Sequence, residues 1–367
     1  MNIFFYLRED NSFMYQWQRI HIFDELEENN HKVITFNDSK YTNAIEANDC
    51  LVNYLKRTKH KIDLFVTAVD SNRIFKQTIQ EIKGMNIPTL LICFDNLHAP
   101  YSQLNIAPLF DLVWLTSRET ENLFTKTKCN TVTLPYAANP SKFHPTFKNE
   151  INSICFVGSL YGTRLEKIND LLNNNIFCDV YSGKANSNNM NYNNILTVKN
   201  AIAILNLFRF KTGQKVLLGA LKKKIIPKEK NIYIDNSYLR INTPLSFNEM
   251  IYAYSNHSLS LNITELRNTY RLKRPVHKLH LRTFEIPMCG GIQFSSYTPE
   301  LSEYFEDEKE IVMFKSTEEM ISKAKFYLSD KNISLRQKIR ANARKRCINE
   351  HTWTKRFNVI FNKLNIH

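Results

Sequence analysis

The chain has 367 residues, of which 43% are hydrophobic and 23% charged, and its formal net charge is +14. This length and balance predict two globular domains and exclude an intrinsically disordered chain. The charge calls for an anionic partner (nucleic acid, the phosphates of a small ligand or an anionic membrane surface), unless a compositional bias raised it without function.

The N-terminal half alternates short apolar runs with amphipathic segments. The expected strands are residues 2–7, 31–36, 61–69, 88–94, 112–116 and 131–135. Apolar residues recur every three to four positions in 17–30 and 75–85, which predicts helices. This alternation favours a parallel sheet with helices on both faces. Three prolines within 135–145 indicate the connection to a second domain.

The C-terminal half repeats the pattern. The expected strands are residues 153–159, 177–183, 240–247, 258–264, 290–296 and 310–314. Residues 335–364 read as a helix pair. We therefore predict an α/β protein of two facing Rossmann-like doubly wound domains, 1–145 and 146–349. Ligands of such sheets bind beyond the carboxyl ends of the strands.

The start of the chain and its cysteines predict a compartment. The apolar run 2–7 is short and followed directly by Arg8, so we expect no signal peptide, and no apolar stretch is long enough for a membrane helix. The seven cysteines show no CxxC spacing. Free thiols in a reducing compartment explain them better than disulfides or zinc. We expect a cytoplasmic protein.

The segment 156–164, FVGSLYGTR, predicts a strand, a turn of small residues and a helix start. Gly158 and Ser159 let the backbone approach a ligand, and Arg164 adds a cation beside the helix N-terminus. These features suit a diphosphate. The segment lacks both GxGxxG and GxxxxGK[ST], which argues against a dinucleotide or P-loop site. The alternative is an ordinary glycine turn with a solvated arginine.

The segment 277–291, HKLHLRTFEIPMCGG, carries the strongest functional signal. Arg282 and Glu285 lie on an expected helix that ends at Gly290 and Gly291, just before a buried strand. A carboxylate in this place could accept hydrogen bonds from both hydroxyls of a ribose. The alternative is a solvated glutamate, which the surrounding apolar residues disfavour.

These two segments, with SLSLNIT and TPELSEYFEDEKEIVMFKSTEEMISKAKFYLSD, resemble the CgeB-like glycosyltransferases of the GT-B fold. The resemblance spans roughly residues 90–357 and is strongest over 277–357. It implies a hexosyltransferase that moves a sugar from a nucleotide-diphosphate donor to a glycan or lipid-linked acceptor, in surface or spore polysaccharide assembly.

The resemblance also assigns roles to residues. Glu285 would hold the nucleotide ribose, and Gly158, Ser159 and Arg164 would meet the donor diphosphate. The remaining donor-binding candidates are Arg282, Gly290 and Gly291. The N-terminal domain would bind the acceptor, and the helix in 350–367 would cross back to it.

His277 marks a departure from the family. Many retaining GT-B enzymes carry two glutamates separated by seven residues, and here His277 stands in the first position, ahead of Glu285. His277 could contact the sugar or the phosphate, or it could simply start a helix after Pro275. Retention or inversion at the sugar carbon therefore stays open.

A general base for an inverting transfer is expected from the N-terminal domain. Asp95 follows the strand 88–94, and His98 comes three residues later. Either could take the proton of the acceptor hydroxyl, and either could equally cap the next helix. Because no DxD pair stands in a metal-binding context, we expect no metal cofactor, with cationic side chains neutralising the leaving diphosphate.

Two basic clusters remain. The stretch 208–230 mixes Lys222, Lys223 and Lys224 with apolar residues, which suits an anionic membrane surface on the inner face of the membrane, or else a solvated face. The stretch 267–275 interleaves tyrosine with arginine and lysine. It permits an alternative function, binding nucleic acid or glycosylating its bases.

Overall fold

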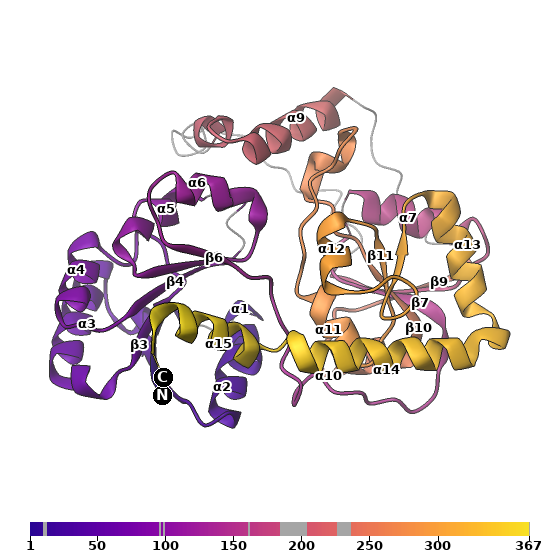
Figure 1. The fold of residues 1–367 in the computed structure, drawn as a ribbon. Helices are drawn as coiled ribbons and strands as arrows, with labels where there is room; N and C mark the ends of the chain where they lie inside the picture. Colours follow the sequence, from indigo (N-terminus) through magenta and orange to yellow (C-terminus); the bar gives the residue numbers. More distant parts are fainter. Residues whose placement is uncertain are drawn as a thin grey trace. The chain divides into compact units, whose positions relative to one another are not determined.

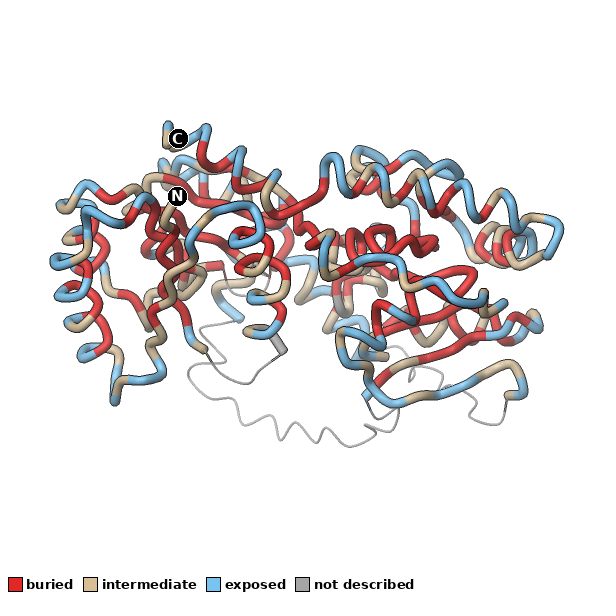
Figure 2. Tube along the Cα trace, turned by 90° about the horizontal axis from the view of Figure 1, so that it is seen from below, coloured by how far each residue is buried: buried red, intermediate tan, exposed pale blue. Residues whose placement is uncertain are grey.

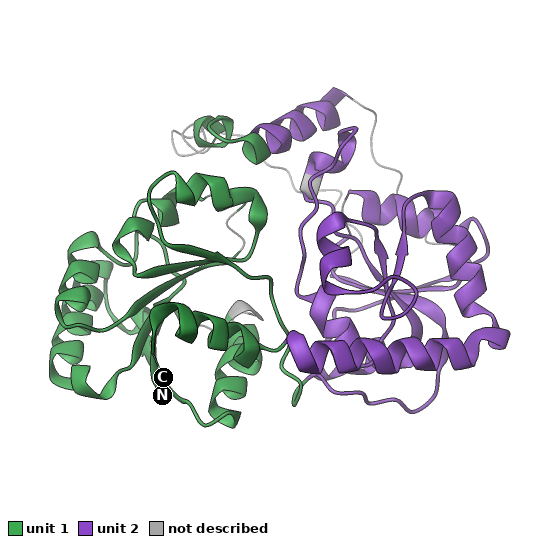
Figure 3. Ribbon diagram, viewed as in Figure 1, with its two compact units in different colours: residues 1–142, 202–213, 352–367 green, residues 143–201, 214–351 purple. Residues whose placement is uncertain are grey.

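The computed structural model describes residues 1–9, 13–94, 97, 100–160, 162–183, 204–225 and 236–366. The chain divides into two compact units (Figure 3). Unit 1 comprises Met1–Lys142, Ile202–Gly213 and Thr352–His367, and unit 2 comprises Phe143–Ala201 and Gln214–His351. The segment Ile202–Gly213 therefore groups with the N-terminal unit, whereas the sequence boundaries placed it in the second domain.

Unit 1 is built on a six-stranded parallel sheet of order β2-β1-β3-β4-β5-β6. Its strands are β1 Asn2–Leu7, β2 Lys32–Asn37, β3 Leu64–Thr67, β4 Thr89–Cys93, β5 Leu112–Leu115 and β6 Thr131–Thr133. Its helices are α1 Phe13–Gln18, α2 Asp24–Glu28, α3 Ala44–Thr58, α4 Lys76–Gly84, α5 Tyr101–Leu104, α6 Glu121–Thr125 and α15 Trp353–Leu364. The central strands are fully buried because helices cover both faces of the sheet (Figures 1 and 2).

The C-terminal helix α15 completes the core of unit 1. The Trp353 ring meets Trp17 at a centroid distance of 5.4 Å and Trp114 at 5.7 Å, and all three indoles are buried. The Arg356 side chain donates hydrogen bonds to the carbonyls of Pro135 and Tyr136. Residues from both ends of the chain therefore share one core.

Unit 2 repeats the architecture with a parallel sheet of order β12-β11-β10-β7-β8-β9. Its strands are β7 Ile151–Val157, β8 Cys178–Tyr181, β9 Leu239–Asn242, β10 His257–Asn262, β11 Gln293–Ser296 and β12 Val312–Phe314. Its helices are α7 Thr163–Leu172, α10 Phe247–Asn256, α11 Arg282–Met288, α12 Pro299–Tyr304, α13 Thr317–Leu328 and α14 Ile333–Glu350. The predicted fold class, two Rossmann-like α/β domains, is confirmed.

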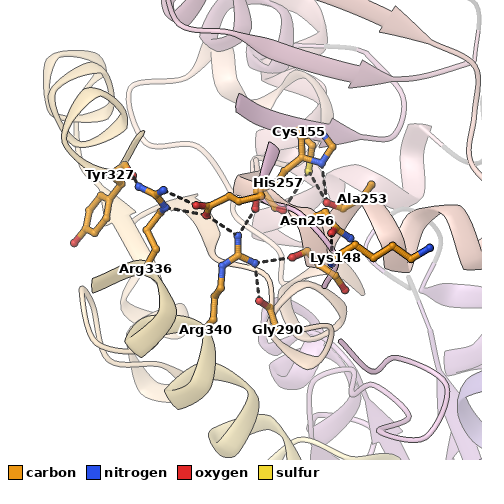
Figure 4. Close-up of polar contacts among 12 residues, drawn as sticks. Lys148, Cys155, Ala253, Asn256, His257, Gly290, Tyr327, Arg336 and Arg340 are labelled. Carbon is orange, nitrogen blue, oxygen red and sulfur yellow. Dashed lines mark hydrogen bonds and ion pairs between the residues drawn. The ribbon is translucent and has the colours of Figure 1, made fainter. Parts of the chain in front are cut away.

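A buried ionic network fixes α14 to the amino ends of the strands of unit 2 (Figure 4). The Glu150 carboxylate accepts from the Nε of Arg336 at 2.9 Å, and the Nη2 of Arg340 lies 3.3 Å from it. The Arg340 guanidinium also donates to the carbonyls of Ser255, Gly290 and His257. Because every charge in the network has a partner, the network holds α14 in one place at the amino edge of the sheet.

Helix α9 Lys211–Ile225 runs from unit 1 into unit 2. Within the described ranges, no helix combines the length and the hydrophobicity that crossing a lipid bilayer requires.

Candidate functional site

The two segments singled out from the sequence meet at the carboxyl edge of the sheet in unit 2. Gly158 directly follows β7 with φ of 137°, a conformation that L side chains rarely adopt. A Cβ at Gly158 would lie 2.2 Å from the Nη2 of Arg282, at the first residue of α11. The missing side chain therefore makes room for the guanidinium, and the turn and α11 form one site.

Two guanidinium groups lie over a single aromatic ring at this edge. The Cζ atoms of Arg164 and Arg282 are 5.7 and 5.8 Å from the ring centroid of Phe156. Arg164 is buried, and its Nη1 donates to the carbonyl of Ser159 at 2.8 Å. Cation–π contact stabilises each charge, yet two cations on one ring repel each other. The arrangement therefore favours an anion beside Gly158, with Arg164 holding the turn.

The N-terminus of α7 points into the same edge. Its N-cap residue is Gly162, with φ of 63° and ψ of −140°, and no side chain of the described residues caps the helix start. Thr163, the first residue of α7, donates from Oγ1 to the Glu265 carboxylate at 3.2 Å. An uncapped helix start offers backbone N–H groups and the positive end of the helix dipole to an anion.

His280 is a component of this edge that the sequence reasoning missed. Burial, together with the charges of Arg282, Lys278 and Arg164, lowers the pKa of His280 well below its usual value. The imidazole is therefore neutral at physiological pH. Its Nε2 and the Nη1 of Arg282 are both buried without a hydrogen-bond partner among the described residues. A ligand that satisfied both atoms would gain binding energy.

Lys278 adds a buried amine next to this group. Its side chain is 2% exposed, and burial lowers its pKa to about 7. The Lys278 backbone N–H donates to the carbonyl of Thr264 at 2.9 Å, which fixes the segment to the end of β10. Lys278 therefore changes its charge near neutral pH, and an arriving anion favours the charged form.

Glu285 lies in the first turn of α11, 2% exposed. Burial raises the pKa of Tyr254, on α10, well above its usual value. The charges of Arg282 and Glu285 also act on this phenol: Arg282 lowers its pKa, and Glu285 raises it. The Tyr254 Oη is buried and has no hydrogen-bond partner among the described residues. The carboxylate is therefore part of a polar group between α10 and α11, and a solvated Glu285 is excluded. Its contact with a ribose stays a prediction.

His277 does not start a helix, and that alternative was wrong. Residues 277–281 precede α11, and His277 forms a β-bridge with Glu265 instead. Its Nδ1 lies 2.9 Å from the Oγ1 of Thr264. Burial lowers the pKa of His277, and Lys167 lowers it further against the opposing effect of Glu265. A contact between His277 and the sugar stays a prediction.

Gly290 and Gly291 lie at the other end of α11, at the amino edge of the sheet. Gly290 has φ of 68°, and a Cβ at Gly291 would lie 2.5 Å from the carbonyl oxygen of Tyr254. Packing therefore accounts for both glycines, and a role in donor binding stays untested. A cavity of about 550 Å³ also lies at this edge. It is lined by residues of α14 together with Pro145, Phe147, Ser255 and Gly290.

The remaining predicted features are the candidate bases and the lysine cluster. Asp95 and His98, the candidate bases, fall outside the described residues. Lys222, Lys223 and Lys224 form the last turn of α9, where they are exposed.

Comparison with known proteins agrees with this architecture. Residues 216–362 match the model of a family described as glycosyl transferase-like. No curated protein sequence gives a significant match. Three solved structures have a similar fold, and because each is less than 25% identical in sequence, the likeness concerns the fold alone. The HepE protein of Anabaena in complex with UDP and glucose has a TM-score of 0.54 and 11% identity, covering 100% of this chain and 99% of that chain. A glycosyltransferase from Rickettsia africae has 0.56 and 12%, covering 99% and 98%. An alpha-glucosyltransferase in complex with UDP and a 13-mer DNA containing a HMU base has 0.57 and 14%, covering 100% and 99%.

The family match falls on a part of the chain that contributes to the site in unit 2. The family match covers α11 and α14, and the turn at Gly158 precedes it in the chain. Residues 216–362 are therefore similar to a glycosyl transferase-like family, and the fold of the whole chain is similar to the folds of these solved structures.

Proposed function

We propose that the protein transfers a sugar from a nucleotide-diphosphate donor bound at the carboxyl edge of unit 2. The observation that carries this proposal is the pair of guanidinium groups of Arg164 and Arg282 over Phe156, beside Gly158. A diphosphate carries the charge opposite to that of the two guanidinium groups, and the N-terminus of α7 adds backbone N–H donors.

In this proposal each element has a task in the reaction. Arg282 and His280 bind the diphosphate, and the charge of Arg282 together with hydrogen bonds from both side chains stabilises it as it leaves the sugar. Arg164 keeps the turn in shape through the carbonyl of Ser159. Glu285 accepts the ribose hydroxyls. Water is excluded there because Glu285, Phe156 and Tyr254 are buried.

The finer assignment follows the sequence resemblance. We propose a metal-independent hexosyltransferase of the CgeB-like subfamily, acting in the cytoplasm on a glycan or lipid-linked acceptor in surface or spore polysaccharide assembly. The support is the motif in 277–291 and the cationic groups that could take the place of a metal at the diphosphate.

The test is calorimetric titration of the full chain with UDP, GDP and the two nucleosides. We expect Arg282→Ala to weaken nucleoside diphosphate binding by roughly ten- to a hundredfold while nucleoside binding is kept, because a hydrogen bond to a charged group contributes about 1.5–3 kcal/mol. Glu285→Ala should weaken nucleotide and nucleoside alike. If no nucleotide binds, or if both variants bind as tightly as the wild type, the donor site is not here.

A panel of nucleotide sugars, read by release of nucleoside diphosphate, then identifies the donor. Turnover should persist in EDTA. Loss of turnover on chelation, restored by magnesium or manganese, would contradict the metal-independent mechanism.

A second candidate acceptor is nucleic acid. One of the similar folds is an alpha-glucosyltransferase seen with DNA containing a HMU base, and the present chain carries a net charge of +14. Adding such DNA to the donor assay distinguishes the two: faster release of nucleoside diphosphate with labelled DNA as product favours the nucleic-acid acceptor.

A further inference from the structure

Helix α9 carries an apolar stripe that no described residue covers. Leu218, Leu221 and Ile225 are 52%, 55% and 81% exposed, although aliphatic side chains of this size are usually buried. Their spacing of three and four residues puts them on one face of the helix. A continuous exposed apolar stripe is typical of a surface that has a partner.

The lysines of α9 are arranged around this stripe. At 100° per residue, Lys215 and Lys222 lie along one side of the stripe and Lys224 lies along the other. Lys223 points to the opposite face of the helix. The fifteen residues of α9 contain no aspartate or glutamate, so nothing within the helix neutralises these charges.

The opposite face of α9 fixes the helix in unit 2. Gly219 is buried against the 3-10 helix Arg267–Arg271, where a Cβ would lie 2.5 Å from the carbonyl oxygen of Asn268. This close backbone contact leaves no room for the helix to turn its apolar stripe inward. The stripe therefore faces outward as a fixed feature of the helix.

We propose that α9 docks the protein on a bilayer rich in anionic phospholipid. Leu218, Leu221 and Ile225 would enter the boundary between headgroups and acyl chains, and the flanking lysines would reach the lipid phosphates with their ammonium groups. A helix with an apolar stripe between rows of lysine has the charge and the hydrophobicity that this surface requires. Nucleic acid would satisfy the lysines but would leave the three aliphatic side chains in water, so lipid is the better partner. The inference does not depend on the proposed reaction.

The experiment is sedimentation of the full chain with vesicles of phosphatidylcholine alone and of phosphatidylcholine mixed with phosphatidylglycerol. We expect binding to the mixed vesicles only, and release by salt, because screening shortens the electrostatic reach to about 8–10 Å at physiological ionic strength. Lys215→Gln/Lys222→Gln should weaken binding by about twenty- to thirtyfold, since each lysine near an anionic surface contributes about a factor of five. Leu221→Gln/Ile225→Gln should weaken it by at least about tenfold.

Two control variants match these changes away from α9. Lys59→Gln/Lys61→Gln removes the same charge from an exposed site in unit 1, and Ile45→Gln/Ile333→Gln replaces two exposed isoleucines of α3 and α14. Both should sediment as the wild type does. A thermal melt of each variant confirms that it is folded.

Three outcomes would overturn the proposal. The wild type could fail to bind the mixed vesicles, or the α9 variants could bind as tightly as the controls. The α9 variants could also keep vesicle binding and lose affinity for a single-stranded oligonucleotide, in which case the helix serves nucleic acid. Nucleotide affinity measured on the same preparations separates a failure of docking from a failure of the donor site.

Discussion

At the scale of single residues, the backbone at Gly158 determines where the charged guanidinium of Arg282 can lie. Its φ of 137° and the 2.2 Å between a hypothetical Cβ and the Arg282 Nη2 mean that any side chain would displace the guanidinium. Gly158→Ala should therefore lower the affinity for nucleoside diphosphate by at least about tenfold, by calorimetry, because the charged hydrogen bond is lost.

The control for this substitution is Gly84→Ala on α4, where a Cβ would meet no atom within 4 Å. This variant should bind as the wild type does. A folded Gly158→Ala protein with unchanged affinity would show that the position of Arg282 does not matter for the ligand.

Lys278 predicts a pH dependence of donor binding. Its pKa is lowered to about 7, so the free protein carries a neutral amine above that pH and an ammonium below it. An anionic diphosphate favours the ammonium, and binding above pH 7 therefore takes up a proton. The dissociation constant for UDP should rise between about pH 7 and 9, by up to tenfold per pH unit.

Lys278→Met is the matched variant, because it keeps a buried chain of similar length without the charge. Its dissociation constant should change less with pH over the same range, since titration of the ligand itself is common to both proteins. Parallel curves for the two proteins would exclude Lys278 from the binding equilibrium.

The limits of prediction at this scale have physical causes. The residues of the turn at Gly158 and of the segment around Glu285 could be found from the sequence, because small residues at a strand end and a carboxylate among apolar neighbours are local patterns. His280 could not, since its importance comes from burial between Arg282 and Lys278, which only the folded chain creates. Arg164 was expected to meet the diphosphate; the structure shows it buried over Phe156 and bonded to the carbonyl of Ser159, and its contact with a ligand stays a prediction.

At the scale of elements, the strands could be predicted from the sequence, whereas the direction of α11, which decides which of its residues reach the carboxyl edge, could not. Strand β1 was expected at residues 2–7 and is found at Asn2–Leu7, because a short apolar run has few alternatives in a parallel sheet. Helix α11 begins at Arg282, since residues before it pair with the segment after β10. The helix then runs away from the carboxyl edge. That direction separates Arg282 from Gly290 and Gly291, which the linear sequence places close together.

The contact between α15 and α2 gives a prediction about stability. The Thr354 N–H donates to the Glu25 Oε1 at 2.6 Å, and Glu25 is 1% exposed. Burial raises the pKa of Glu25 from 4.5 to about 7, although hydrogen bonds from Thr354 and its neighbours oppose this shift. The folded protein therefore loses stability as pH rises from 4.5 to 7, and above 7 it bears the full cost of a buried carboxylate.

Glu25→Gln keeps the acceptor for Thr354 and removes the charge. Its free energy of unfolding should exceed that of the wild type by up to about 3 kcal/mol at about pH 8. The two proteins should be nearly equal at about pH 3.5, which is below both pKa values, so that the wild-type carboxyl is protonated in both states. Urea denaturation at the two pH values measures the difference, and a variant less stable at pH 8 would contradict the assigned protonation.

At the scale of the whole molecule, unit 1 requires the C-terminal helix. Trp353 packs on Trp17 and Trp114, so a chain ending at His351 leaves two indoles without their partner. We expect tryptophan emission to shift to longer wavelength in this shortened chain. Loss of a buried tryptophan costs about 3–5 kcal/mol, a large part of the stability of a domain of this size.

Unit 2 lacks tryptophan and keeps its full sequence in the shortened chain, so hydrogen exchange should show it still protected. Unchanged emission and unchanged protection in unit 1 would mean that α15 adds nothing to its stability.

Because the core of unit 1 includes Trp353, unit 1 cannot finish folding until the ribosome has synthesised the C-terminal helix. Lys142 leaves the exit tunnel long before Trp353, and at roughly 5–20 residues per second this interval lasts on the order of ten seconds or more. During that time the first sheet is synthesised but lacks its final helix, and unit 2 receives its last residue just before that helix is made. The half made first is therefore completed last, and during translation its uncovered aromatic surface is where a nascent-chain chaperone would bind.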